Sequence, residues 1–433
     1  MSLSIVFLTF FAMLGMLLMG LPIAVTMAMV GMIGGGIVFG WPFLESTGAV
    51  IWSVHNENIL TAIPLFVLLG ELMLRSGIAD RMYVAMAAWL GRLPGGLIHT
   101  NIGCCALFAA TSGSSVATAA TIGTVALPTL GERKYSMKQA LGSLAAGGTL
   151  GILIPPSVNM LIYGSLTNNS IGKLFMAGLI PGITLSLLFM CYIAVTNWGP
   201  EGKREEKVSL QDKMRLSVNL IPPAVIFGIV MGSIYLGIAT ATESAALGVM
   251  AALFFGWKSG RLNLEFFQNC FVQTARITGM ILLIITAAFI LNLTISLTGV
   301  VDDLTAWVVS FGLSTTGLLL VLILFYLCLG MFMDVLSMQV VTIPITYPIM
   351  MAMGVDPIWF GVFIVLMCEL GMITPPVGMN LFVVQSVRKD GGNINEVMWG
   401  VLPYMLIMVG FTVALMIFPQ IALWLPNLML SPS

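Results

Sequence analysis

The chain has 433 residues, of which 59% are hydrophobic and only 8% are charged, whereas about 25% of the residues in an ordinary soluble domain are charged. The 17 Lys and Arg residues and 18 Asp and Glu residues give a formal net charge of −1, so no basic surface is available to neutralise the phosphates of a nucleic acid. The composition excludes a water-soluble protein and indicates a polytopic membrane protein, with room for roughly ten to twelve helical spans of about 20 residues each.

The sequence also lacks the motifs of common enzyme classes. The six cysteines lie in apolar stretches without metal-ligand spacing, and the two histidines, His55 and His99, are isolated, which argues against a zinc site, a disulfide framework and a His-based active site. No GxxxxGK[ST] phosphate-binding loop occurs, so the chain has no P-loop for ATP hydrolysis. We expect no enzymatic activity, and we interpret the apolar N-terminus as a first span without a cleavable signal.

Ten hydrophobic segments are long enough to cross a bilayer, alone or tilted. In chain order they are residues 3–20, 21–40, 59–76, 139–165, 172–197, 217–238, 240–257, 272–297, 357–387 and 396–425. Two further apolar stretches, 97–131 and 316–352, are interrupted near the middle, the first by Thr111–Ser115 and the second around Asp334. Each arm of the first stretch has about 14 residues and would measure roughly 21 Å as a helix, and the arms of the second are slightly longer. Such helices are too short for a hydrocarbon core of about 30 Å. These stretches predict two re-entrant hairpins.

The distribution of basic residues supports this arrangement through the positive-inside rule. If neither hairpin crosses the membrane, the connections on one side are 75–96, 131–138, 198–216, 258–271 and 388–395. Of the 17 basic residues, only Lys173 then falls on the opposite side, and the connections 41–58 and 298–315 on that side have no Lys or Arg. We therefore predict that the basic side is cytoplasmic and that both termini are periplasmic.

An internal repeat is the strongest signal in the sequence. GILIPPSVNMLIY, residues 151–163, aligns with GMITPPVGMNLFV, residues 371–383, and the matches of Pro128 with Pro348 and Gly178 with Gly400 have almost the same offset. Equivalent points are separated by an odd number of predicted spans, so we expect the second copy to be upside-down. The predicted copies, within one transporter domain over 1–433, are about 58–182, with hairpin 97–131 and broken helix 139–165, and about 280–403, with hairpin 316–352 and broken helix 357–387. Inverted repeats with interrupted helices are typical of secondary transporters.

The tip of the first hairpin is rich in small and hydroxyl-bearing residues. It reads Ser112-Gly113-Ser114-Ser115, with Thr118 one turn further on. A glycine lets the chain turn, and hydroxyl and carbonyl oxygens suit a hard cation. The alternative interpretation is close packing of helices through small residues.

Each predicted broken helix adds glycines and polar residues around its Pro-Pro pair. A proline has no N–H, so a nearby carbonyl loses its helical partner, and such a carbonyl is tolerated in a membrane where it faces protein, water or an ion. The residues in question are Gly147, Gly148, Gly151, Pro155, Ser157 and Asn159 in the first helix and Thr374, Pro375, Gly378 and Asn380 in the second. The asparagines fit ligand binding and interhelical hydrogen bonding equally well, and the N-termini of half-helices suit a carboxylate.

Asp334 is the one ionisable residue between Asp303 and Asp356. A carboxylate at the middle of a membrane costs about 2.5 to 3.5 kcal/mol on the insertion scale, so we expect a compensating role. A sodium ligand, a helix cap and a proton carrier all fit. Glu71 and Arg75, four residues apart, predict a local ion pair on one helix face.

Four segments together resemble the large membrane subunit of TRAP transporters, the tripartite ATP-independent periplasmic transporters. They are TSGSSVATAATIGTVALPTL, GGTLGILIPPSVNMLIYG, KLFMAGLIPG and DPIWFGVFIVLMCELGMITPPVGMNLFVVQ, and the similarity extends over nearly the whole chain. The resemblance implies an all-α, elevator-type fold in the bacterial inner membrane, here with about ten transmembrane helices and two re-entrant hairpins. It also implies a sodium-coupled importer with two sodium sites, a separate small four-helix membrane subunit, and a periplasmic binding protein that delivers an organic acid.

The resemblance places one sodium site at the first hairpin and first broken helix, and the other near Asp334 and the second broken helix. The predicted sodium-site residues are Ser112, Gly113, Ser114, Ser115, Gly148, Gly151, Pro155, Ser157, Asp334, Thr374, Pro375 and Gly378. The predicted substrate-binding residues are Ser115, Thr118, Asn159 and Asn380. A solitary divalent-anion or citrate-type symporter, which needs no binding protein, is the competing interpretation. The sequence leaves open which acid is carried.

Overall fold

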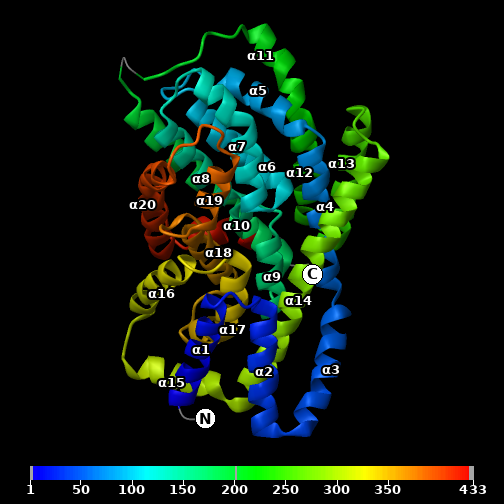
Figure 1. Ribbon diagram of the computed structural model, residues 1–433, viewed down its shortest axis with the longest axis vertical. Coiled ribbons are helices and arrows are strands. Elements are labelled where there is room, and N and C mark those ends of the chain that lie inside the picture. The colour runs from blue at the N-terminus through cyan, green and yellow to red at the C-terminus, as the bar shows by residue number, and fades with distance from the viewer. Residues whose placement is uncertain (1–2, 200–201, 429–433) are drawn as a thin grey trace.

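The computed structural model describes residues 3–199 and 202–428, and all regular secondary structure in these ranges is helical (Figure 1). The first part of the chain contains α1 (Leu3–Leu18), α2 (Ile23–Phe39), α3 (Trp41–His55), η1 (Asn58–Thr61), α4 (Ala62–Arg75), α5 (Ile78–Leu90), α6 (Leu97–Ser112), α7 (Ser115–Glu132), α8 (Met137–Leu153), α9 (Val158–Thr167) and α10 (Ile171–Thr196). The second part contains α11 (Leu210–Ser217), η2 (Val218–Leu220), α12 (Ile221–Tyr235), α13 (Ala241–Lys258), α14 (Leu264–Thr298), α15 (Val300–Ser310), α16 (Thr315–Gly330), α17 (Val335–Ala352), α18 (Pro357–Ile373), α19 (Met379–Val387), α20 (Asn395–Ile417) and α21 (Gln420–Leu428).

Several of these helices can cross a membrane. Six are long and apolar enough, or seven if the bent pair α8–α9 counts as one span. The six are Asn58–Arg75, Ile171–Thr196, Leu210–Tyr235, Leu264–Thr298, Val335–Ala352 and Asn395–Ile417. Val335–Ala352 is one arm of the second predicted hairpin, so the prediction that its arms are too short to cross is wrong for this helix, which has 18 residues. The other segments predicted to cross contain helices that are shorter, broken or less apolar. For example, α1 and α2 have 16 and 17 residues, because the chain turns at Gly20 and Gly40, both with positive φ.

Both predicted hairpins form as helix pairs, and both predicted broken helices are interrupted at their Pro-Pro pairs. α6 and α7 are joined at Gly113, and α16 and α17 are joined by a turn that ends at Asp334. Residues 154–157 separate α8 from α9, with a bend of 41°, and residues 374–378 separate α18 from α19. The breaks occur there because a proline cannot continue the helical hydrogen-bond ladder.

Four predicted connections contain helices that hydrophobicity alone did not indicate. They are α3 within 41–58, α5 within 75–96, α11, which begins within 198–216 and ends at Ser217, and α15 within 298–315. α5 illustrates the reason, because its buried side chains, among them Ile78, Met82 and Ala85, follow helical spacing on one face while Asp80 and Arg81 are exposed. An amphipathic helix of this kind has too many polar residues to stand out as an apolar segment.

The order of helices in the first part of the chain recurs in the second. α5 to α10 begin at positions 78, 97, 115, 137, 158 and 171, and α15 to α20 begin at positions 300, 315, 335, 357, 379 and 395. The displacement from each helix to its counterpart is nearly constant. Each set therefore contains a short helix, a hairpin, a broken helix and a long helix, in the same order.

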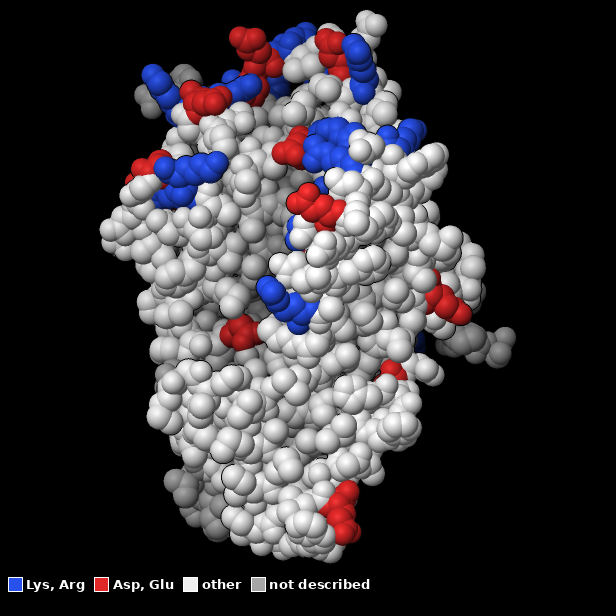
Figure 2. Space-filling view, turned by 45° about the vertical axis from the view of Figure 1, so that its right-hand side comes forward, with Lys and Arg blue, Asp and Glu red and all other residues white. Residues whose placement is uncertain are grey.

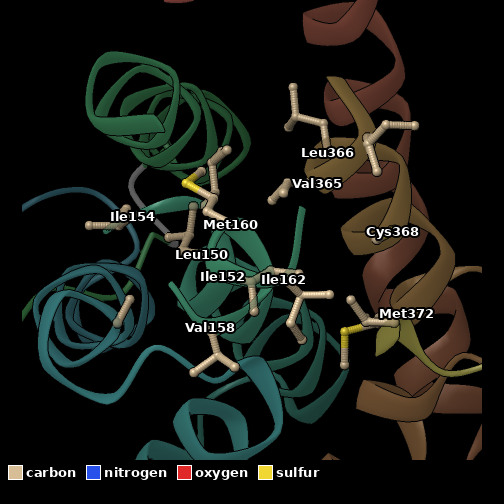
Figure 3. Close-up of a cluster of buried hydrophobic side chains, with 14 of the residues drawn as sticks. Leu150, Ile152, Ile154, Val158, Met160, Ile162, Val365, Leu366, Cys368 and Met372 are labelled. Atoms are coloured by element: carbon tan, nitrogen blue, oxygen red, sulfur yellow. The ribbon is translucent and has the colours of Figure 1, made fainter. Parts of the chain in front are cut away.

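The two broken helices pack against each other in the interior. Figure 3 shows Ile152 and Ile162 of α8–α9 on the side of the cluster that faces Met372 of α18, and all three side chains are buried. Glycines allow still closer contacts elsewhere, because a Cβ on Gly142 of α8 would clash with the carbonyl oxygen of Gly400 on α20. In a bilayer, tight packing and small residues, more than exclusion of water, hold helices together.

Charged side chains are concentrated at one end of the molecule. In Figure 2, Lys and Arg gather at the upper end, where Figure 1 places α5 and α11, and the lower end of the same face shows acidic but no basic side chains. This asymmetry is the one on which the predicted orientation depends.

Candidate substrate and ion site

A cavity of about 330 Å³, which we call the tip cavity, lies where the hairpins and broken helices meet. Ser112–Ala117 of the first hairpin and Asp334–Leu336 of the second contribute to its wall. Residues beside the two helix breaks also line it, namely Ile152, Val158, Asn159, Met372 and Met379. The remaining wall comes from α4 and α14. Segments from both halves of the chain therefore share one cavity.

The first hairpin tip is packed directly on the first broken helix. Gly113 has φ +62°, in the left-handed region that favours glycine, and a Cβ there would lie 2.8 Å from the carbonyl oxygen of Pro156. A Cβ on Gly151 of α8 would lie 2.6 Å from the carbonyl oxygen of Ser114. Glycine is thus required on both sides of the contact, which brings backbone carbonyls of the tip and of the break close together.

The hydroxyl groups of the tip donate to backbone carbonyls. The Thr118 hydroxyl donates to the carbonyl of Ser114 at 2.8 Å, and the Ser115 hydroxyl donates to the carbonyl of Thr149 at 3.3 Å. The Ser112 and Thr118 hydroxyl oxygens are 3.0 Å apart. The Ser114 hydroxyl caps α7 by accepting from the N–H of Ala117 at 3.4 Å. Ser112, Gly113, Ser114 and Ser115 all line the tip cavity.

The other residues predicted for this site occupy the surrounding layer. Ser157 is fully buried and caps α9 by accepting from the N–H of Met160 at 3.4 Å. Gly148 lies against α7 and α19, because a Cβ there would be 2.7 Å from the Cβ of Ala119 and 3.2 Å from the side-chain nitrogen of Asn380. Gly148, Gly151, Pro155, Ser157 and Thr118 are not among the residues that line the tip cavity, so these five support the tip and do not form its surface.

The two candidate asparagines occupy different environments. Asn159 lines the tip cavity, and its buried side-chain oxygen has no hydrogen-bond partner among the described residues. Asn380 is fully buried away from the cavity lining and donates to the carbonyl of Ala145 at 3.3 Å. The buried side-chain oxygen of Asn380 also has no hydrogen-bond partner among the described residues, so the two asparagines differ in that Asn159 lines the tip cavity and Asn380 makes an interhelical hydrogen bond through its nitrogen.

Asp334 acts as the N-cap of α17 and also lines the tip cavity. Its carboxylate accepts from the N–H groups of Leu336 at 3.1 Å and Ser337 at 3.4 Å, and from the Ser337 hydroxyl. Its capping role, one of the three that the sequence allowed, is thus present in the structure. The cap stabilises a helix end that would otherwise leave N–H groups unpaired.

The remaining predicted sodium residues form a compact turn beside this cap. Gly378 donates through its N–H to the carbonyl of Thr374 at 3.1 Å, around Pro375, and the Thr374 hydroxyl donates to the carbonyl of Leu370 at 2.6 Å. A Cβ on Gly378 would lie 2.6 Å from the carbonyl oxygen of Met372. Thr374, Pro375 and Gly378 do not line the tip cavity, and only their neighbours Met372 and Met379 reach it.

In the wall of the tip cavity formed by α4 and α14, sequence analysis singled out only Glu71, and only for its ion pair with Arg75. The lining residues there are Val67, Gly70, Glu71, Leu74, Ile277, Met280 and Ile281. A Cβ on Gly70 would lie 2.9 Å from the carbonyl oxygen of Ser112, so α4 touches the hairpin tip. Glu71 forms the predicted ion pair with Arg75 at 3.0 Å. The Gly-Glu pair inside an apolar run is the one local signal that marks this wall.

Glu369 is a second acidic residue whose position the sequence did not explain. It is fully buried on α18, and its carboxylate lies near the backbone of Ile152 and Leu153 without a hydrogen bond of normal geometry to any described residue. In the alignment that matches Gly151 with Gly371, the counterpart of Glu369 is Thr149, whose carbonyl accepts from Ser115. The two halves of the chain therefore place different chemical groups at equivalent positions.

Comparison with known proteins identifies the family. Residues 10–421 match the sequence model of the family described as "Tripartite ATP-independent periplasmic transporter, DctM component". The chain belongs to this family. Its members are permease subunits of membrane transporters and not enzymes, so the predicted TRAP resemblance and the absence of enzymatic activity are confirmed.

Individual relatives of this DctM-family chain are similar over most of their length. The C4-dicarboxylate TRAP transporter large permease protein of Rhodobacter capsulatus is 35% identical over 391 residues, which cover 86% of this chain and 87% of the relative. The sialic acid TRAP transporter large permease protein of Vibrio cholerae is 31% identical over 429 residues, with 97% and 98% covered. Among solved structures, the YdaH transporter of Alcanivorax borkumensis has a TM-score of 0.58 at 15% identity, covering 91% of this chain and 90% of that one. This last similarity shows the fold alone.

Proposed function

We propose that this large permease subunit drives the uptake of an organic acid with a sodium gradient, and that the tip cavity holds the transported acid between two sodium sites. The observation that carries the proposal is the convergence of the first hairpin tip, Asp334 and both helix breaks on one cavity of about 330 Å³. Such breaks at the centre of a transporter are typical of sites for substrates and coupling ions.

The proposed first sodium site uses the oxygens of Ser112–Ser115 and of the break from Gly148 to Ser157. It is supported by the packing of the tip carbonyls against Gly151 and Pro156, because unwound carbonyls suit sodium. The proposed second site uses Asp334 and the turn Thr374–Gly378. Asp334 supplies the negative charge there, and the turn supplies carbonyls that a helix would have consumed.

The proposed substrate is held through its carboxylate. α7 and α9 begin beside the cavity at Ser115 and Val158, and the N-terminus of a helix attracts an anion. Asn159 adds a side-chain amide that reaches the same space. The names of the relatives mention C4-dicarboxylates and sialic acid, both of which carry carboxylate groups.

We further propose that transport occurs by an elevator movement in the bacterial inner membrane. The hairpins, broken helices, α10 and α20 would move as one body against α4 and α14, with the repeats about 58–182 and 280–403 in opposite orientations and both termini in the periplasm. The close packing of α8 against α18 and α20 supports a rigid moving body, and the twofold recurrence of the helix order supports the repeat.

Two partners complete the proposed system, namely a small four-helix membrane subunit on a separate chain and a periplasmic binding protein. Membership of the tripartite family favours this system over a solitary symporter.

The test of partner dependence uses proteoliposomes that contain this chain and its small subunit, with an inward sodium gradient. Radiolabelled succinate and sialic acid serve as probes, each with and without the cognate binding protein. We expect uptake only when the binding protein is present. Full uptake of the free acid without it would support the solitary symporter instead.

A further inference from the structure

A second cavity, of about 310 Å³, lies between α3, the end of α9 and α14. In Figure 1, α3 is at the end of the molecule opposite α5 and α11. The polar residues that line it include Ser53, Glu57, Ser165, Asn292 and Ser296. The Ser165 hydroxyl is buried there and has no hydrogen-bond partner among the described residues. This second cavity has no role in the site described above.

The second cavity and the tip cavity have equivalent walls. The residues of α4 that line the tip cavity are Val67, Gly70, Glu71 and Leu74. The residues of α14 that line the second cavity are Phe289, Asn292, Leu293 and Ser296. Val67 corresponds to Phe289, Gly70 to Asn292, Glu71 to Leu293 and Leu74 to Ser296. The two residues of each pair are as far apart in sequence as Ile78 and Val300, where α5 and α15 begin. One helix face therefore occurs twice, once in each half of the chain.

The α4 face contacts the tip of its own hairpin in the structure as observed. On α4, Gly70 touches the backbone of Ser112 at the end of α6, as the 2.9 Å distance from a built Cβ shows. The counterpart of α6 is α16, which ends at Gly330, so the counterpart of the Ser112 region is the turn Gly330–Asp334. Phe332, in this turn, is 58% exposed, and neither cavity includes it.

We propose that in a second conformation the turn Gly330–Asp334 lies against Asn292 of α14, and that the second cavity then becomes the chamber through which the organic acid enters. This inference depends on the elevator movement proposed above. It adds the residues of α14 that the second hairpin would contact after that movement. Asn292 is larger than Gly70, so the close backbone contact cannot be repeated. Its amide instead donates a hydrogen bond to a carbonyl of the turn, while Ser53 and Ser296 keep the chamber polar for a carboxylate.

The test is a cysteine cross-link between α14 and the turn. Asn292→Cys and Phe332→Cys are combined with Cys191→Ser and Cys328→Ser, because Cys191 and Cys328 are the exposed native thiols of the described chain. A disulfide needs Cα atoms about 4.4 to 6.8 Å apart, so it forms only if the two segments meet. The matched control pairs Asn292→Cys with Leu324→Cys, which is similarly exposed at 64% but lies about two helical turns earlier.

We expect oxidised membranes to show the 292–332 disulfide and not the 292–324 disulfide. Its yield should rise at least twofold when Gly70→Ala is added, because the new methyl group would press on the Ser112 backbone and disfavour the observed conformation. The disulfide should lower uptake at least tenfold, and reduction should restore it. Three results would each overturn the inference. The first is a disulfide yield that Gly70→Ala leaves unchanged, the second is the absence of the disulfide in a protein that transports when reduced, and the third is full uptake with the disulfide intact. Loss of uptake in the reduced protein and in the parent alike would instead count against the proposed function.

Discussion

The direction of hydrogen bonds at the first hairpin tip bears on what the tip can bind. The hydroxyl hydrogens of Ser115 and Thr118 are already donated to the carbonyls of Thr149 and Ser114. What remains on each hydroxyl is an oxygen with free lone pairs, which can accept a cation but cannot donate to a carboxylate. This hydrogen bonding fits the sodium role that we propose for Ser115, and Thr118 is not among the residues that line the tip cavity.

Replacing Ser115 or Ser114 with alanine should raise the sodium concentration needed for half-maximal uptake. If one oxygen ligand contributes about 1 kcal/mol, the increase is about fivefold. Uptake measured against sodium concentration gives this value. Thr124→Ala is the matched control, because Thr124 lies on the same helix and its hydroxyl is satisfied by the carbonyl of Ala120 at 2.7 Å. Unchanged sodium dependence in both serine variants would assign the tip to helix packing.

The two asparagines should respond differently to substitution. Asn159→Ala should raise the KM for the acid about tenfold, because it removes a polar group that faces the cavity, and should leave the melting temperature almost unchanged. Asn380→Ala should lower the melting temperature in detergent, because it removes the hydrogen bond to Ala145. Uptake kinetics and thermal unfolding of both variants check this. Equal effects on KM would contradict the assignment of Asn380 to a structural role.

At the scale of elements, the cap of α17 separates the possible roles of Asp334. Asparagine is as good an N-cap as aspartate, so Asp334→Asn should preserve the stability of the protein. If the carboxylate binds sodium, the same variant should need a higher sodium concentration for half-maximal uptake. Asp334→Ala should in addition lose about 1 kcal/mol of stability. Thermal unfolding and sodium titration of both variants distinguish these effects. If Asp334→Asn transports like the wild type, with an unchanged sodium requirement, helix capping is the one role left for Asp334.

The hairpins and helix breaks could be predicted because their signals are local. The polar tip at Ser112–Ser115 and the Pro-Pro pairs each interrupt an apolar run within a few residues. The helices α3, α5, α11 and α15 were missed because their amphipathic patterns resemble connections. The wall that includes Gly70 of α4 and Ile281 of α14 forms because these two helices pack beside both hairpins. No local sequence pattern specifies which helices pack together.

At the scale of the whole molecule, the separation of charges predicts orientation. Ser209 lies just before α11, at the basic end, and Asp303 lies on α15. In a background of Cys191→Ser and Cys328→Ser, an impermeant thiol reagent added to intact cells should label Asp303→Cys but not Ser209→Cys. Labelling at both positions, or at position 209 alone, would contradict the orientation and the inverted repeat.

The coupling ion is the central claim of this account. The tip cavity offers hydroxyl and carbonyl oxygens, which suit sodium, and Glu71, Asp334 and Glu369 are buried or partly buried carboxylates that a proton could use instead. The most direct measurement is uptake into proteoliposomes that hold the complete transporter, energised in turn by an inward sodium gradient and by an inward proton gradient without sodium. We predict uptake with the sodium gradient and none with the proton gradient alone. Uptake driven by protons in the absence of sodium would contradict the account.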